Sequence, residues 1–504
     1  MRHGGLLWFC HRSLPPGINS LAEMDVVVTS ARQYAERIVI ARCEYIKSRR
    51  FLTISDNSFG WMSQGHVPYS GRLLVGAPYF LSMIPAREQQ KAARALAVFA
   101  VLIANGPVAY GQEGDESREG DDNSPPQFFA RGSLKLDLRY RYEYVDEEGF
   151  DASARASLLR SRLTAQSGPL GPLSGLLELD HVSTPGTDDY NSTENGQVQF
   201  PTIADPQGTE FNQAWLRYSS TDTDATVGRQ RIVLDRGRFI GAKPWRQNEQ
   251  TYDAVRVQWK AAPDFALDAS YVNQVNRVFG PSDGANPADW YGDTALLRLN
   301  HDLAPGQVLT GFAYLVDVDE QRGFAPGKTI NNSSDTLGIA YHGVFSGIDL
   351  RARLATQKSA GSSELEYRAA YYLVEAGAPL GKMRLRAAYE VLGADDGVGF
   401  GTPLANGHGH QGWADKFLST PGDGIKDAWV SVNGKVGSVA LTARYHDFSA
   451  ESSSVNFGRE LDLQLQWEIN AWLTATAKAA VFDTEAPDRY PDTRKAWLML
   501  QLRL

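Results

Sequence analysis

Apolar and polar residues alternate one by one through most of the chain after residue 131. In residues 134–144, Leu and Tyr occupy every second position, and charged residues occupy the positions between them. Residues 460–469 repeat the pattern, and in residues 498–504 Leu again occupies every second position. Because successive side chains of a strand point to opposite faces, each such segment predicts a strand with one apolar and one polar face. We find no helical period after residue 111, so we predict an all-β fold.

The alternating segments number about 18 and are mostly about 10 to 14 residues long, as expected for tilted strands that cross a membrane. Long and short connections follow one another along the chain. Long extracellular loops and short periplasmic turns are typical of membrane barrels. A soluble β-sandwich also has alternating strands, but it has no reason to keep this succession of links. We therefore predict a transmembrane, antiparallel, up-and-down β-barrel with strands at 133–145, 154–167, 173–184, 211–221, 225–235, 252–261, 265–278, 294–303, 308–319, 335–344, 348–359, 365–378, 382–394, 425–436, 439–450, 457–470, 472–484 and 494–504.

The first part of the chain has a different character. Residues 1–82 contain both cysteines, Cys10 and Cys43, and they show no regular pattern. We predict that translation begins at Met83 and that residues 1–82 are upstream sequence read in frame, outside the mature protein. The alternative is a true N-terminal extension.

The next residues have the layout of a secretory signal peptide. In residues 83–111, positive side chains precede an apolar stretch at 95–104, and small residues follow it. Residues 112–130 are polar and acidic, which predicts a disordered segment. Residues 131–504 then form the predicted barrel.

Composition argues against several functional classes. The 504 residues carry a formal net charge of −9, and an acidic exported chain is not expected to bind nucleic acid. No apolar run approaches the roughly 20 residues of a membrane-spanning helix. The scattered histidines do not suggest a Ser-His-acid set, so we expect no enzymatic activity and no cofactor. His408 and His410 lie in a Gly-rich loop that we expect to be solvated, and we predict no metal site.

Five segments of the sequence carry a specific resemblance. They are RYRYE (139–143), FNQAWLRY (211–218), GRQRIVLDRGRFIG (228–241), WRQNEQTYDAVRV (245–257) and GWADKFLSTPGDGIKDAWV (412–430). In these segments the chain resembles the alginate-export family of bacterial outer-membrane porins, from about Arg131 to its C-terminus. The resemblance implies an outer-membrane barrel of about 18 strands. It also implies passive diffusion of an anionic uronate polymer through a pore lined by arginine and lysine.

We therefore expect an outer-membrane porin that passes anionic solutes, with alginate or another uronate polymer as the candidate solute. The alternative is a general or small-anion-specific porin unrelated to alginate. An outer-membrane enzyme is disfavoured because no catalytic set is evident, and a gated receptor because residues 112–130 are too short for a plug domain. Expected partners are outer-membrane lipid and lipopolysaccharide, an anionic polysaccharide or small anionic solute, and periplasmic secretion proteins.

Arginine recurs at the charged positions of the alternating segments, which we expect to face the lumen. The guanidinium group stays charged and meets carboxylates with a planar fork. Many weak contacts let a polyanion pass, whereas one tight site would stop it. One loop is expected to reach over the mouth and narrow it through Arg236, Arg238, Lys243 and Arg246, with Phe239 and Trp245. Asp415 and Lys416 could narrow the mouth in the same way, and the alternative is that residues 412–417 are a folded outer loop held by its aromatics. Carboxylates such as Asp137, Glu178 and Glu390 share the lumen, so some arginines are expected only to pair with them and stiffen the wall. The predicted pore-lining residues are Arg139, Arg141, Arg160, Arg162, Arg217, Arg229, Arg231, Arg238, Arg246, Arg256, Arg298, Arg351, Arg353, Arg384 and Arg386.

Overall fold

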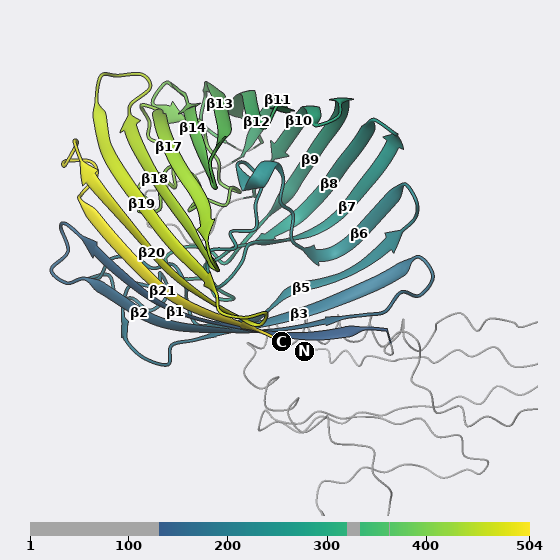
Figure 1. Ribbon diagram of the computed structural model, residues 1–504, viewed down its shortest axis with the longest axis horizontal. Helices are drawn as coiled ribbons and strands as arrows, with labels where there is room; N and C mark the ends of the chain where they lie inside the picture. The colour runs from purple at the N-terminus through teal and green to yellow at the C-terminus, as the bar shows by residue number, and fades with distance from the viewer. Residues whose placement is uncertain (1–130, 320–332, 362) are drawn as a thin grey trace, which may run out of the picture. The chain divides into compact units, whose positions relative to one another are not determined.

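The computed structural model describes residues 131–319, 333–361 and 363–504, and they fold as a closed antiparallel β-barrel of 18 strands (Figure 1). The last strand pairs with the first, so that Tyr140 lies opposite Leu500. Closure leaves no unpaired sheet edge, which a structure surrounded by lipid requires. The barrel strands are β1 (Ser133–Glu147), β2 (Ala154–Gln166), β3 (Leu173–Ser183), β5 (Gly208–Ser219), β6 (Thr223–Gln230), β7 (Thr251–Ala262), β8 (Phe265–Asn276), β9 (Asp289–Ala304), β10 (Gln307–Val316), β11 (Ser334–Phe345), β12 (Ile348–Ser359), β13 (Arg368–Leu380), β14 (Met383–Leu392), β17 (Ile425–Val436), β18 (Val439–Ser449), β19 (Asn456–Glu468), β20 (Leu473–Thr484) and β21 (Thr493–Arg503). The two-residue strands β4 (Asp188–Asp189), β15 (Ala394–Asp395) and β16 (Val398–Gly399) lie in the long loops.

The predicted barrel and its strand number are confirmed. Most strand boundaries agree with the sequence pattern to within a few residues. The predicted short turns are also present, and Gly306, Gly347 and Gly381 occupy them with φ of 75°, 84° and 60°. Glycine suits these positions because it adopts positive φ without a steric penalty. Alternation and turn residues together were therefore sufficient to define the wall.

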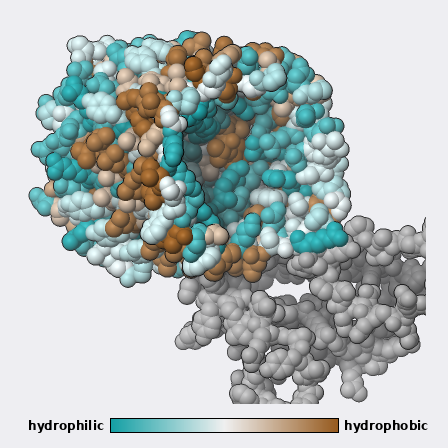
Figure 2. All heavy atoms as spheres, in the orientation of Figure 1, coloured by the Kyte–Doolittle hydropathy of each residue, from teal (hydrophilic) through white to brown (hydrophobic). Residues whose placement is uncertain are grey.

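The outer surface of the barrel is apolar. In β19, Leu461, Leu463 and Leu465 are 45–50% exposed, whereas Glu460 and Asp462 between them are buried in the interior. Figure 2 shows apolar side chains on the outer wall and mostly hydrophilic ones lining the hollow. A soluble protein buries its leucines and exposes its carboxylates, whereas here the leucines are exposed on the outside and the carboxylates are buried inside. This distribution fits a wall that faces lipid.

Two long connections fold into the lumen. We call residues 231–250 the first inner loop and residues 393–424 the second inner loop. The short helical turn η1 (Asp235–Gly237) of the first inner loop lies inside the ring of strands (Figure 1). Phe239 of this loop packs on Tyr371 of β13 with ring centroids 5.0 Å apart, and Phe417 of the second packs on Phe448 of β18 at 4.7 Å. These contacts place an apolar cluster inside the barrel, and the loops narrow the bore.

The end of β6 differs from the prediction. The strand was expected at 225–235, but it ends at Gln230 and the chain turns inward. Ile232 and Leu234 were expected on the apolar face of a strand, and instead they are buried in the cluster inside the lumen. An apolar residue that packs inside the lumen has the same sequence signature as one that faces lipid, which explains the error.

No helix in the described parts of the chain is long and apolar enough to span a membrane. The predictions for residues 1–82, 83–111 and 112–130 lie outside the described residues.

Candidate functional site: an arginine-lined cavity between the inner loops and the wall

The two inner loops are interlocked. The side chain of Asn406 lies against Gly237 and Gly241, where an added Cβ atom would clash with it. Backbone hydrogen bonds join Asn406 N to Gly237 O and Gly241 N to Leu404 O, both at 2.8 Å. Lys243 Nζ donates to the carbonyl of Ala405 at 2.6 Å. The loops therefore form one unit inside the barrel, although they are far apart in the sequence.

Ion pairs fill the lumen beside β1, β2 and β3. Arg162 donates to both carboxylate oxygens of Asp180, at 2.7 and 2.6 Å, and to Glu249 Oε1 at 2.8 Å. Arg141 contacts the buried carboxylate of Asp205. The positive and negative side chains neutralise one another, so this part of the lumen is a rigid network of ion pairs and not an open charged surface. We call this network the first joint, because it attaches the first inner loop to the wall.

Glu249 of the first inner loop is the centre of this joint. Besides Arg162, it contacts Arg231, and its Oε1 lies 3.5 Å from Arg160 Nη1. Burial raises the pKa of Glu249, but the three guanidinium groups outweigh burial and lower it below its ordinary value. Glu249 is therefore ionised and ties the loop to the wall.

A second joint holds the loops against β20 and β21. Nζ of Lys478 lies 4.1, 3.7 and 5.3 Å from the ring centroids of Trp245, Trp413 and Trp497. Trp245 belongs to the first inner loop and Trp413 to the second, whereas Trp497 belongs to β21. A buried ammonium among aromatic faces is stabilised by cation–π attraction. One wall lysine thus holds both loops at once.

His408 completes the second joint. Its Nε2 lies 2.5 Å from Lys478 Nζ, and its Nδ1 lies 2.8 Å from Asp415 Oδ1. Because the ammonium can only donate, Nε2 accepts, and Nδ1 donates to Asp415. Burial lowers the pKa of His408 to about 3, so the ring is neutral. The expectation that His408 lies in a solvated loop is wrong. Among the described residues, no three His, Cys, Asp or Glu side chains are grouped to hold a metal ion.

Lys416 of the second inner loop reaches the seam of the barrel. Its Nζ donates to Glu147 Oε2 of β1 at 3.0 Å and to Thr493 Oγ1 of β21 at 2.9 Å. Glu147 and Thr493 are partners in the pairing that closes the sheet. The second inner loop is thereby fixed to both strands of the seam.

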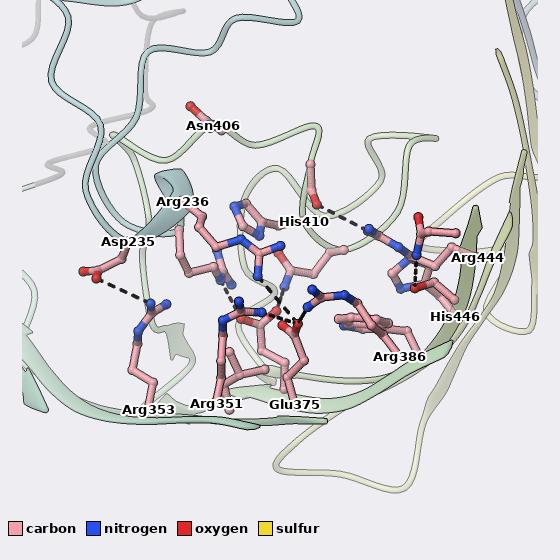
Figure 3. A pocket seen from close by; sticks show the side chains of 18 of the residues that line it. Asp235, Arg236, Arg351, Arg353, Glu375, Arg386, Asn406, His410, Arg444 and His446 are labelled. Atoms are coloured by element: carbon pink, nitrogen blue, oxygen red, sulfur yellow. Dashed lines mark hydrogen bonds and ion pairs between the residues drawn. The ribbon is translucent and has the colours of Figure 1, made fainter. Parts of the chain in front are cut away.

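Beside β12, β13, β14, β17 and β18 the structure leaves a cavity of about 450 Å³ between the wall and the loops (Figure 3). Seven arginines line it, against three carboxylates. Trp429, Ser431 and Asn433 add an aromatic face and uncharged polar groups. The cavity is therefore cationic, although Asp349 beside it also pairs with Arg351 and Arg386. The arginines are Arg236, Arg238, Arg351, Arg353, Arg384, Arg386 and Arg444, and the carboxylates are Asp235, Glu375 and Glu390.

The predicted arginines separate into groups. Lining the cavity are Arg238, Arg351, Arg353, Arg384 and Arg386. Buried or half-buried in the ion pairs beside β1, β2 and β3 are Arg141, Arg160, Arg162 and Arg231. Arg139 is also buried, but its Nε donates to the amide oxygen of Gln247 at 2.8 Å. Elsewhere in the lumen, contacts join Arg246 to Asp415 (3.4 Å), Arg256 to Asp268 (2.8 Å), Arg298 to Asp235 (3.1 Å) and Arg217 to Thr226 (3.0 Å). Arg238 and Arg246 do not reach over the mouth as expected, because their loop folds inward and Arg238 binds Glu390 at 2.6 Å.

Arg229 does not share the lumen face. It alternates with Gln230 and shares its strand face with Val227, which is 52% exposed on the outer wall. Its Nε donates to Asp253 Oδ1 at 2.7 Å, and Asp253 shares its face with the exposed Val255. The inward orientation predicted for Arg229 is therefore wrong.

The cavity residues Arg444, Glu375 and Arg236 were missing from the predicted pore-lining set. Arg444 alternates with Ala443 and Tyr445, so the same period would have found it. Glu375 also follows the alternation, but it was not among the carboxylates expected in the lumen. Arg236 was expected only at the mouth, because no sequence period identifies a loop residue that points into a lumen.

Comparisons with known proteins agree with this architecture. Residues 131–394 match the model of the family described as alginate export, which covers more than half of the chain. No curated protein sequence matches the chain.

Solved structures share the fold at low sequence identity. OccAB4 of Acinetobacter baumannii is 12% identical with a TM-score of 0.56, and the alignment covers 75% of this chain and 100% of that chain. OpdO of Pseudomonas aeruginosa gives the same identity and TM-score, with 75% and 98% coverage. The P. aeruginosa outer membrane protein opdK is 13% identical with a TM-score of 0.53, with 75% and 99% coverage.

The lipid-facing barrel, the porin-like fold and the family match together define the protein. It is a porin or export channel of the bacterial outer membrane. The chain belongs to the alginate export family.

Proposed function

We propose that the channel passes anionic solutes by diffusion along the arginine wall of the cavity, and that uronate polymers such as alginate are among these solutes. The observation that carries the proposal is the charge of the cavity, in which seven arginines face four carboxylates: three line the cavity, and Asp349 lies beside it. Net charge would suggest the opposite preference, since the whole chain carries −9. Selectivity depends instead on the charges nearest the path, where water is scarce and screening is weak.

The division of the lumen supports this reading. Beside β1, β2 and β3 the guanidinium groups form ion pairs with buried carboxylates such as Asp180 and Glu249, so they offer little free charge to a solute. Beside β12 and β14 the arginines outnumber their partners and line open space. Repeated guanidinium groups bind carboxylates in a planar fork, and several weak sites in a row permit passage. Trp429 and Asn433 offer a ring face and an amide to a sugar.

The test is the ion preference of the purified protein in a planar bilayer under a tenfold KCl gradient. The wild-type channel is expected to favour Cl⁻ over K⁺. The double substitution Arg351→Gln with Arg386→Gln removes two cavity charges and is expected to lower the Cl⁻/K⁺ permeability ratio about tenfold, which corresponds to about 1.4 kcal/mol. The matched control is Arg155→Gln with Arg459→Gln, because both arginines are more than half exposed and lie outside the cavity.

The control variant is expected to keep the wild-type reversal potential. A wild-type channel that favours K⁺ would contradict the proposal, and so would a cavity variant that matches the control. Trigalacturonate added to the same bilayer tests the solute class. It is expected to block Cl⁻ current, whereas neutral maltotriose at the same concentration is not. Cl⁻ preference without block by trigalacturonate would support the small-anion alternative.

A further inference from the structure

One carboxylate in the cavity contacts three guanidinium groups, and each of these comes from a different element of the fold. Oε1 of Glu375 on β13 accepts from Arg351 Nη1 of β12 at 2.7 Å and also from Nη1 of Arg386 on β14. Nη1 of Arg236, at the tip of the first inner loop, lies 3.6 Å from the same oxygen. Figure 3 shows Glu375 between these side chains.

The three arginines approach from two sides of the cavity. Arg351 lies directly opposite Glu375 in the pairing of β12 with β13, so both belong to the wall. Arg236 comes from the loop, on a turn in which Asp235, Arg236 and Gly237 have φ of 51°, 61° and 77°. Non-glycine residues adopt this left-handed conformation only where the surroundings hold them. The turn therefore aims Arg236 at the wall, and Glu375 spans the space between them.

A carboxylate between opposed guanidinium groups has the same chemistry as a solute carboxylate in transit. We propose that Glu375 is a specificity-determining residue that acts as a built-in competitor, so a solute carboxylate binds the arginines by displacing it. This inference rests on the proposed function. A competitor of this kind weakens binding, and a solute that is weakly bound leaves quickly, as conduction requires.

Neighbouring contacts allow this exchange without collapse of the wall. Asp349 Oδ2 accepts from Arg351 Nη2 at 3.1 Å and lies 3.5 Å from Arg386 Nη2. Both wall arginines therefore keep a counter-charge when Glu375 is displaced or replaced. Asp235 in turn lies 3.7 Å from Arg353, so the loop keeps its own contact with the wall.

The substitution Glu375→Gln tests the inference in planar bilayers, with trigalacturonate as the probe that blocks Cl⁻ current. The variant keeps the shape of the side chain but removes the competing charge. We expect its half-blocking concentration to fall about tenfold and the dwell time of each block to lengthen in proportion. Glu375→Asp keeps the charge and is expected to remain near wild type. The matched control is Glu468→Gln, which removes a carboxylate that pairs with Lys435 at 2.8 Å, both side chains being more than half exposed.

Two results would overturn the inference. If Glu375→Gln binds trigalacturonate no more tightly than Glu468→Gln does, Glu375 does not compete with the solute. If Glu375→Gln binds it more weakly than wild type does, the carboxylate positions the arginines instead. Either result leaves the proposed function intact as long as the wild-type channel favours Cl⁻. A wild-type preference for K⁺ would defeat the proposed function itself.

Discussion

Replacing Glu249 with glutamine is expected to loosen the first inner loop while the strands of the wall stay paired. The carboxylate joins the loop to Arg160 and Arg162 of β2 and also contacts Arg231 within the loop. Glutamine keeps the size and the hydrogen-bonding capacity of the side chain but removes its charge. Buried guanidinium groups then lose a shared counter-charge, and the joint weakens.

The expected cost follows from what each arginine retains. Removing one partner of a buried ion pair costs about 3–5 kcal/mol. Arg162 keeps its two contacts with Asp180, and Arg231 keeps Glu178 at 2.5 Å, so we expect a loss near 3 kcal/mol. The control Glu468→Gln breaks an exposed pair, for which less than about 1 kcal/mol is expected.

The assay is urea unfolding of the folded barrel in detergent, followed by tryptophan fluorescence, together with single-channel conductance. Glu249→Gln is expected to lower the unfolding midpoint and raise conductance, because the loop narrows the bore. The pKa of Glu249 is lowered in the folded state, so its contribution is complete above the ordinary carboxyl pKa of 4.5 and is lost as the pH falls below it. The unfolding midpoints of the wild type and Glu249→Gln should therefore become more alike as the pH falls below 4.5. Equal midpoints for Glu249→Gln and Glu468→Gln at pH 7 would refute this account of the joint.

Two further predictions concern the wall and the second joint. Leu463→Arg places a charge on the lipid face, at a cost of about 2–4 kcal/mol near mid-height of the membrane. Gln466→Arg lies on the lumen face and should be tolerated. Equal yields of heat-resistant folded barrel for the two variants would contradict the assignment of Leu463 to lipid and Gln466 to the lumen. His408 has a pKa lowered to about 3, so its contribution to stability is present above the ordinary value of 6.5 and is lost as the pH falls from 6.5 through 3. Fluorescence of Trp245, which stacks on His408, should change over this range in the wild type and not in His408→Asn, and an identical acid response of the two would argue against this assignment.

The strands could be predicted because each wall residue faces either lipid or lumen, and a period of two records that choice. The first inner loop could not be predicted in this way. Ile232 and Leu234 continue the alternation beyond Gln230, and only packing against Phe312 and its neighbours inside the barrel distinguishes them from lipid-facing residues. A local sequence pattern indicates that an apolar side chain is kept away from water. It does not indicate whether lipid or the packed interior of the barrel surrounds that side chain.

The arginines show the same limit of sequence-based prediction, because the pattern gives the direction of a side chain but not its ion-pair partners. Alternation identified Arg351 and Arg162 equally well as inward, and both are paired with carboxylates. Arg351, however, borders open space, whereas Arg162 is enclosed by its partners. The difference depends on which carboxylates lie across the sheet and on the loop, which is set by register and tertiary contact. Arg229 failed for a related reason. Its neighbours Gln230 and Gly228 carry no apolar signal, so the sequence left the face of this strand end ambiguous.

The hydrogen bonds of Lys416 have a consequence for the order of folding. Its two partners, Glu147 and Thr493, come from the first and last strands, the most distant pairing in the chain. Neighbouring hairpins can form early, whereas contacts between remote residues must await the ordering of the segments between them. Lys416 can find both partners only after those strands have met. The attachment of the second inner loop to the seam is therefore expected to form last, once the barrel has closed.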